Sequence, residues 1–383
     1  MKKFHVIISH SLGELDVILP IFLEFHNPKT TKIKIIITTQ KIYNQYLNSK
    51  IYNDIAKKLN IKIIYSQLYN KFDFPLIDRK NTLVIFLNKI FNKFISFYLS
   101  FTFIVRNFDI FFSKIIFNDA SSQIIKNLIK IVLFDILKKR NYVYHHGHAF
   151  TQEGEIKSKN IINKKAIVLL FDENCKKHWT SIYDYSKFHL LGFPKFFKNW
   201  IEFIKNYNDY DIKDEKYVLI YSRESHHKYY MDIEKYDYLI KSSYKSIREN
   251  LPDYKIYIKT HPRENINYLK ELIKENDMKN IEITFLHSSI LAKNAFLIIS
   301  YWTSSILESL SLKIPSVEFY IEANKFRIVE SKGSVYKNIG IHSVSTKKEL
   351  DVFINDCINH KYVYPNFLNK YFNMKNNNFL ETN

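Results

Sequence analysis

Residues 259–264 read Lys-Thr-His-Pro-Arg-Glu and follow an apolar run typical of a buried strand. Pro262 lacks an N–H and disfavours helix at His261, so the imidazole is expected at the end of that strand. Ligands of open parallel sheets bind at the carboxyl ends of the strands. There His261 could stabilise or protonate a leaving phosphate, with Lys259 adding positive charge. A surface loop that happens to contain His-Pro is the alternative.

Residues 300–308 read Ser-Tyr-Trp-Thr-Ser-Ser-Ile-Leu-Glu and follow another apolar run. The apolar spacing after Thr303 predicts a helix, and Thr or Ser is a good residue to cap it. Free N–H groups and hydroxyls at such a place suit a phosphate. The candidate ligands are Ser300, Thr303, Ser304 and Ser305. We expect Glu308, about one turn further on, to accept hydrogen bonds from ribose hydroxyls. Helix capping without a ligand is the alternative.

Two further strand ends carry polar groups. Ser222 ends the expected strand 217–222 and Arg223 follows it, where Arg223 could bind phosphate or belong to a solvated loop. His10, Gly13 and Glu14 follow the first apolar run and are expected to contact an acceptor. Gly13 would let the backbone approach a ligand closely.

Apolar runs alternate with amphipathic stretches along most of the chain, which predicts an α/β fold with parallel, doubly wound sheets. The expected strands are 4–9, 32–38, 61–65, 109–117, 142–145, 166–171 and 188–191, then 217–222, 254–259, 281–285, 296–300 and 315–320. The polar stretch 206–215 separates these two series. We therefore expect an acceptor-binding lobe at 1–205, a nucleotide-donor-binding lobe at 216–360, a cleft between them, and a C-terminal helix and tail at 361–383.

Composition excludes several classes of protein. The chain has 6 glycines in 383 residues, so neither a GxGxxG dinucleotide fingerprint nor a P-loop can be written. Its 2 cysteines exclude a disulfide scaffold and a cysteine-based zinc site, and we expect no metal. The formal net charge of +19 fits attraction to anions, or lysines that simply cover solvated faces.

Lys259–Pro262 and the segment 300–308 resemble the HP and serine motifs of bacterial sialyltransferases, polysialyltransferases and Kdo transferases, and more distantly of CDP-glycerol glycerophosphotransferases. The resemblance covers roughly residues 142–320. It implies a GT-B-like fold of two Rossmann-like lobes and a metal-independent mechanism. It also implies that His261, Ser304 and Ser305 hold the phosphate of a cytidine nucleotide, and that Glu308 contacts its ribose.

One departure from the sialyltransferase pattern concerns the base. Those enzymes carry an acidic pair before a glycine, whereas this chain has His146 before Gly147. An unperturbed imidazole titrates near pH 6.5, which suits a group that takes a proton from an acceptor hydroxyl. Glu153 lies a few residues on and is the competing candidate.

The expected activity is transfer of a nonulosonic acid, sialic acid-like or Kdo, from a CMP-activated donor to a hydroxyl of a capsule or lipooligosaccharide glycan. The donor is a substrate, and no cofactor is expected. The alternatives are a CDP-glycerol or CDP-ribitol polyol-phosphate transferase, a nucleotide-sugar epimerase, and a basic nucleic-acid-binding protein. The last ranks lowest because no RNA or DNA module is recognisable, so no nucleic-acid partner is expected.

Residues 83–105 form the longest apolar stretch, interrupted by two lysines. The clean part, 94–105, is shorter than the roughly 20 residues of a spanning helix. A buried helix is the first expectation, and an interfacial helix that dips into a membrane leaflet is the alternative. We expect a cytoplasmic protein, with peripheral contact to the inner face of the membrane through basic and aromatic surface.

Overall fold

The computed structural model of the chain describes residues 1–68, 82–119, 129, 131–145, 166–172, 187–208, 215–223, 232–262, 264–321, 335–338 and 340–369. These residues form two compact units that meet in sequence at Pro194 and Lys195. Helix α7 (Lys198–Asn206) belongs to unit 2, where Trp200 packs against His287 with ring centroids 6.0 Å apart. The lobe boundaries expected from the sequence stay a prediction.

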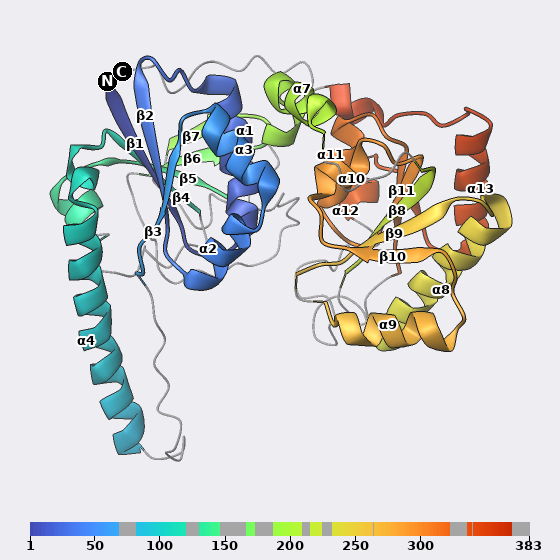
Figure 1. The fold of residues 1–383 in the computed structure, drawn as a ribbon, viewed down its shortest axis with the longest axis horizontal. Helices are drawn as coiled ribbons and strands as arrows, with labels where there is room; N and C mark the ends of the chain where they lie inside the picture. Colours follow the sequence, from blue (N-terminus) through green and yellow to red (C-terminus); the bar gives the residue numbers. More distant parts are fainter. Residues whose placement is uncertain are drawn as a thin grey trace. The chain divides into compact units, whose positions relative to one another are not determined.

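Unit 1 is built on a seven-stranded sheet in the order β3-β2-β1-β4-β5-β6-β7, with every neighbouring pair parallel (Figure 1). The strands are β1 (Lys2–Ile8), β2 (Thr31–Ile37), β3 (Lys62–Tyr65), β4 (Ile115–Asp119), β5 (Arg140–Tyr144), β6 (Ile167–Leu170) and β7 (Lys187–Leu190). Strand order reverses beside β1, so the loop after β1 lies at the switch point where such sheets bind ligands.

The two faces of this sheet are covered by different helices. On one face the ring of Phe22, on α1, packs against the ring of Phe117, on β4, with centroids 5.6 Å apart. On the other face Phe103 of α4 packs with Ile7 and Ile116. The helices are α1 (Leu15–Phe25), α2 (Gln40–Leu47), α3 (Lys50–Lys58) and α4 (Thr82–Arg106), with 3-10 turns η1 (Leu12–Glu14) and η2 (Phe108–Phe112) and a π-helical turn η4 (Ile131–Ile136).

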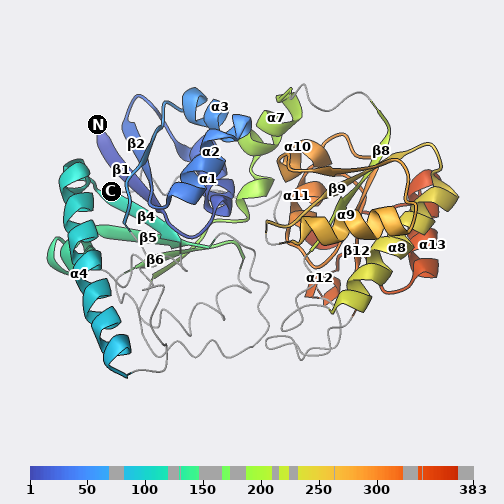
Figure 2. The same ribbon diagram turned by 60° about the horizontal axis from the view of Figure 1, so that its bottom comes forward.

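Unit 2 is built on a six-stranded sheet in the order β10-β9-β8-β11-β12-β13, again with parallel pairs (Figure 2). The strands are β8 (Tyr217–Tyr221), β9 (Lys255–Lys259), β10 (Ile281–Thr284), β11 (Leu297–Ser300), β12 (Ser316–Phe319) and β13 (Ser343–Val344). The helices are α8 (Ile233–Asn250), α9 (Ile266–Glu275), α10 (Ser288–Ala292), α11 (Ser305–Ser311), α12 (Val335–Asn338) and α13 (Lys347–Ile358), and η5 (Pro194–Phe196) and η6 (Asn366–Leu368) are 3-10 turns.

Helix starts in unit 2 follow local side-chain chemistry. The side chains of Asp232, Asn265 and Thr346 accept backbone N–H groups at the first turns of α8, α9 and α13. Glu349 completes a capping box with Thr346. Because these side chains satisfy N–H groups that a helix leaves unpaired, they fix where each helix begins.

The α/β fold with two parallel sheets is confirmed, but two local expectations were wrong. Residues 109–117 do not form one strand, because Phe108–Phe112 is a 3-10 turn and β4 starts at Ile115. Helix α4 is not a buried helix: Phe94 is 69% exposed and Tyr98 is 65% exposed. Among the described residues, no helix has the length and apolarity that crossing a membrane requires.

Candidate functional site

The predicted nucleotide-binding segments of unit 2 follow three neighbouring strands. Strand β8 lies between β9 and β11, and its last residue, Tyr221, pairs with Lys259 and with Ser300. The Ser222 N–H donates to the Lys259 carbonyl at 3.1 Å, and the Tyr301 N–H donates to the Tyr221 carbonyl at 2.9 Å. The loops that follow these strands therefore leave the sheet at the same edge.

Glu264 ties two of these loops together. The hydroxyl of Ser222 lies 2.7–2.8 Å from both carboxylate oxygens of Glu264, and the N–H of His261 donates to Oε2 at 2.8 Å. The hydroxyl of Tyr236, on α8, donates to Oε1 at 2.5 Å. Glu264 is buried. We call this carboxylate with its three donors the Glu264 latch.

The latch fixes the position of His261. The Glu264 N–H returns to the His261 carbonyl at 2.9 Å, which closes a turn over residues 261–264. Burial and the neighbouring Glu264 charge raise the pKa of Tyr236 well above its usual range, so its hydroxyl stays a donor. His261 is half-buried and Pro262 is exposed, so the end of this loop is accessible. The sequence analysis assigned no role to Glu264. Its position three residues after His261 was the feature from which a contact to this loop could have been predicted.

The loop after β11 contains a strained residue. Trp302 has φ of 47°, in the left-handed region, and its ring stacks on Tyr320 with centroids 4.9 Å apart. The guanidinium of Arg223 donates to the Trp302 carbonyl at 3.1 Å and so joins the loops after β8 and β11. A bulky residue with positive φ costs energy and is found most often where geometry serves a function.

The hydroxyl-bearing residues of this loop lie beside one another. The Thr303 and Ser305 hydroxyls are 3.3 Å apart, and the Ser305 N–H donates to Thr303 Oγ1 at 3.4 Å. Ser304 is partly exposed at the start of α11, whereas Ser300 is buried and its hydroxyl lies 3.4 Å from the Thr303 carbonyl. The phosphate-binding role of these residues stays a prediction.

Glu308 faces internal partners. Its Oε2 accepts from the Ser288 hydroxyl at 2.6 Å and the Ser289 hydroxyl at 2.8 Å, both on α10. The ammonium of Lys195 lies 3.7 Å from the same oxygen, and both side chains are largely buried. A contact from Glu308 to ribose stays a prediction, and such a contact would have to use the other carboxylate oxygen or displace a serine.

In unit 1 the loop after β1 is folded onto Glu14. The Oε1 atom of Glu14 accepts the N–H groups of Ser9 at 3.1 Å, His10 at 2.5 Å and Ser11 at 3.0 Å. The Glu14 side chain is fully buried, while His10 is exposed. Gly13 lies inside η1 and does not have a positive φ. Acceptor binding by His10, Gly13 and Glu14 stays a prediction, and Glu14 holds the shape of this loop.

More polar groups are buried at this edge of the unit 1 sheet than sequence reasoning singled out. Tyr144, at the end of β5, directs its hydroxyl to Glu14 Oε2 at 3.4 Å. Burial, and then the charges of Glu14 and Asp119, raise the pKa of Tyr144. Asp119 ends β4 and Asp172 follows β6, and both are buried. Single acidic residues at strand ends were the only signal for them. Within the described parts of the chain, no cluster of three side chains suits a metal ion.

The two candidate bases, His146 and Glu153, lie outside the described residues. His145, the neighbour of His146, is buried at the end of β5 with its ring 4.1 Å from that of Phe171.

A second carboxylate that sequence reasoning missed is Glu318 on β12. It is fully buried, and its Oε2 lies 3.4 Å from the Ser343 hydroxyl. Its Oε1 has no hydrogen-bond partner among the described residues. Burial raises the pKa of Glu318 to about 8, so the group is largely protonated at neutral pH.

No known family model matches this sequence, and no curated protein matches it. Solved structures do match the fold. A protein from Listeria monocytogenes described as a putative UDP-N-acetylglucosamine 2-epimerase has a TM-score of 0.56 at 9% identity, over 98% of this chain and 92% of its own. The UDP-GlcNAc 2-epimerase of Methanocaldococcus jannaschii has a TM-score of 0.52 at 13% identity, over 98% of this chain and 94% of its own.

UGT73P12 of Glycyrrhiza uralensis, complexed with glycyrrhetinic acid 3-O-monoglucuronide, has a TM-score of 0.52 at 11% identity, over 94% of this chain and 87% of its own. At these identities the likeness concerns the fold alone. The two parallel-sheet units of this chain therefore have the GT-B fold that the sequence predicted.

Proposed function

We propose that this chain is a glycosyltransferase that uses a nucleotide-activated sugar, and that unit 2 binds the donor nucleotide. The observation that carries the proposal is the Glu264 latch, which holds the His261 loop against Ser222 at the edge of the sheet where β8, β9 and β11 end. A carboxylate that uses its lone pairs on a loop amide and a hydroxyl pre-organises that loop before any ligand arrives.

The proposed chemistry is displacement at the anomeric carbon of the donor. The bond from that carbon to the phosphate oxygen breaks, and its electron pair leaves with the nucleotide. The acceptor oxygen forms the new bond, and its proton passes to a base. His261, with Arg223 and the hydroxyls of Ser304 and Ser305, would stabilise the charge on the departing phosphate.

The donor we propose is a CMP-activated nonulosonic acid, sialic acid-like or Kdo, and the acceptor is a hydroxyl of a surface glycan or glycolipid. The support for this donor class is the spacing of His261-Pro262 and the serine segment 303–305. His146 and Glu153 are the proposed bases. A glycolipid acceptor would also give the enzyme a reason to lie peripherally at the inner face of the membrane.

A nucleotide-sugar epimerase is the second candidate, and the two epimerases of similar fold favour it. An epimerase would isomerise its donor with no acceptor present. Incubation with UDP-GlcNAc alone, followed by sugar analysis, tests this directly. Isomerised sugar without transfer would replace our first proposal.

The test of the first proposal is CMP release from CMP-sialic acid and CMP-Kdo in the presence of a glycan acceptor. His261→Asn should lower turnover at least 100-fold while leaving the unfolding transition in place. His360→Asn is the matched control, because His360 is exposed at the end of α13 and Asn tolerates its left-handed backbone. Turnover by His261→Asn close to that of the control would refute the role of His261.

A further inference from the structure

One face of helix α4 carries exposed large side chains at helical spacing. Phe91, Phe94, Tyr98, Phe101 and Val105 follow one another at intervals of three and four residues, and all five are exposed. Such spacing places side chains on one side of a helix. Toward the end of α4 the opposite side is buried through Ser100 and Phe103, and Phe103 packs on the sheet; Phe97, which lies off this row, is also 60% exposed. An apolar row of this length is far more than the isolated exposed residues of an ordinary surface.

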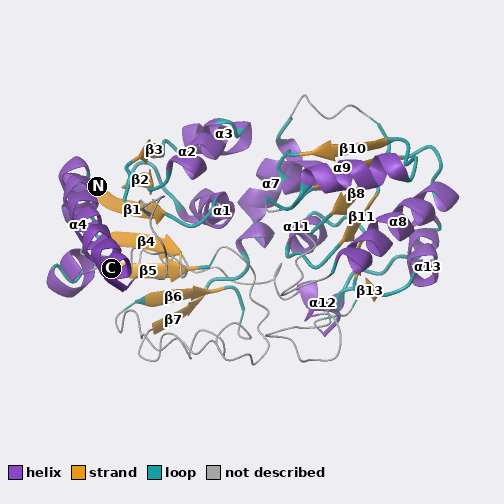
Figure 3. Ribbon diagram, turned by 90° about the horizontal axis from the view of Figure 1, so that it is seen from below, coloured by secondary structure: helices purple, strands orange, loops and turns teal. Residues whose placement is uncertain are grey.

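The row continues past the end of the helix. Phe108 and Phe112 lie on η2, and their ring centroids are 5.8 Å apart. Phe112 is 63% exposed, and the ammonium of Lys3 lies 5.6 Å from its ring centroid. Helix α4 extends outward from the sheet of unit 1 (Figure 1 and Figure 3). From its end, η2 leads the chain to the edge at which β1 begins, where the Lys114 N–H donates to the Lys3 carbonyl at 3.0 Å.

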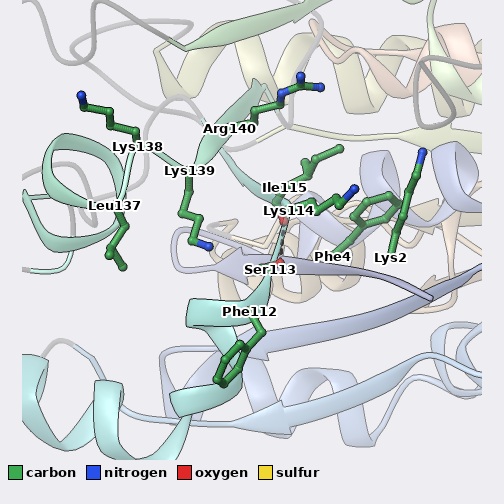
Figure 4. Close-up of a pocket in the computed structure, with 10 residues that line it drawn as sticks. All are labelled: Lys2, Phe4, Phe112, Ser113, Lys114, Ile115, Leu137, Lys138, Lys139 and Arg140. Carbon is green, nitrogen blue, oxygen red and sulfur yellow. Dashed lines mark hydrogen bonds between the residues drawn. The ribbon is translucent and has the colours of Figure 1, made fainter. Parts of the chain in front are cut away.

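At the same edge a cavity of about 410 Å³ collects positive charge (Figure 4). It is lined by Phe112 and by five basic side chains, Lys2, Lys114, Lys138, Lys139 and Arg140. These residues lie at or just before the first residues of β1, β4 and β5. No acidic residue is among the described residues that line it. Asp109, on the adjoining turn, is already held by Lys34 at 2.7 Å.

We infer that the outer row of α4, the two phenylalanines of η2 and this basic cavity form one docking surface for an anionic lipid bilayer. The aromatic side chains enter the headgroup region, and the cavity receives lipid phosphates. Charge complementarity selects this occupant. A second copy of the chain would bring the same cations against the cavity, whereas an anionic bilayer supplies both the negative charge and an apolar layer.

The cavity end of this surface lies at the amino ends of β1, β4 and β5, whereas the loop with His10 and Glu14 follows the carboxyl end of β1. Docking is measured without nucleotide or acceptor, so its failure would leave the proposed transfer reaction untouched.

The experiment is sedimentation of the full chain with vesicles of phosphatidylcholine, with and without one quarter phosphatidylglycerol. We expect binding to the anionic vesicles alone, weakened by added salt. The triple variant Lys114→Gln, Lys138→Gln and Arg140→Gln should lower the partition coefficient about 100-fold, since each charge near an anionic surface contributes about fivefold. The matched control neutralises Lys41, Lys57 and Lys58, which are exposed on α2 and α3.

The aromatic row is tested separately. Phe94→Ser with Phe101→Ser should lower binding at least tenfold at unchanged charge. Phe94→Trp should be quenched by brominated lipid, and Leu47→Trp, on exposed α2 surface, should not. The inference would be overturned by equal quenching of the two tryptophans, by unchanged vesicle binding in the Phe94→Ser, Phe101→Ser variant, or by no vesicle binding at all. A dimer in sedimentation equilibrium that this variant abolishes would also overturn it.

Discussion

The Glu264 latch makes a sharp prediction about a single atom. Glu264→Gln keeps the size of the side chain but replaces one carboxylate oxygen with an NH2 group. The three donors that converge on Glu264 are the hydroxyls of Ser222 and Tyr236 and the N–H of His261. An amide has one accepting oxygen, so in either orientation its NH2 group faces at least one of these donors.

The size of the effect follows from the burial of the latch. Hydrogen bonds to a charged group contribute about 1.5–3 kcal/mol each, and a buried donor left without an acceptor costs a similar amount. Glu264→Gln loses the charge and mispairs one donor, so the free energy of unfolding of unit 2 should fall by about 2–4 kcal/mol. Tyr236→Phe removes one hydrogen bond to the carboxylate and keeps the other two donors, so it should cost about 1.5–3 kcal/mol.

Urea unfolding followed by circular dichroism measures the stability change, and calorimetric titration with CMP measures binding. We expect Glu264→Gln to weaken CMP binding at least tenfold even in conditions where the variant is fully folded, because the His261 loop is no longer fixed. Glu271→Gln, exposed on α9, is the matched control. Unchanged stability and unchanged CMP affinity in Glu264→Gln would refute the latch.

Three further predictions concern buried charges. Glu318→Gln should raise the free energy of unfolding at pH 8.5, by up to about 5 kcal/mol, but should not raise it at pH 4.5. The reason is that the pKa of Glu318 is raised to about 8 in the folded chain. The wild-type free energy of unfolding is therefore undiminished below the unfolded pKa near 4.5 and falls as the pH rises to 8. Burial lowers the pKa of His5 to about 4, so folding favours its neutral form and the free energy of unfolding of the wild type should fall by about 3 kcal/mol between pH 6.5 and pH 4. His5→Asn should not show this fall. Urea midpoints across pH check both, and parallel pH curves for variant and wild type would contradict them. Lys195→Met should cost about 3–5 kcal/mol by leaving the buried Glu308 carboxylate without its cation, and adding Glu308→Gln should restore part of the loss in a double-mutant cycle.

The fold was predictable because apolar runs and amphipathic stretches alternate with little ambiguity. The same patterning placed Lys259, Ser222 and Ser300 at strand ends, and the register pairs Tyr221, one residue earlier than predicted, with Lys259 and Ser300. The predicted strand at residues 109–117 was wrong because an apolar run has the same composition in a strand and in a 3-10 turn. The turn is set by more distant partners, such as the Asn107 amide that donates to the Ser66 hydroxyl at 2.9 Å.

The exposed face of α4 was hidden from sequence reasoning for a related reason. Residues 94–105 are apolar on nearly all sides, so their periodicity does not distinguish the buried face from the exposed one. Only the packing of Phe103 on the sheet shows which side is left uncovered. Burial of Glu264 and Glu318 was equally invisible, because charged residues are expected at the surface.

The two units use the same device to shape a loop at the carboxyl edge of a sheet. Glu14 accepts three backbone N–H groups of the loop after β1, and Glu264 accepts the His261 N–H of the loop after β9. Many α/β proteins shape such loops with glycines, whose backbone can approach a ligand, but this chain has only 6 glycines. A buried carboxylate gives a loop a fixed shape by accepting its amides, and it also occupies amides that could otherwise bind an anion. In the proposed donor site the His261 amide is occupied in this way, so we expect the His261 side chain, rather than its amide, to hold the donor phosphate together with Arg223 and the serine hydroxyls.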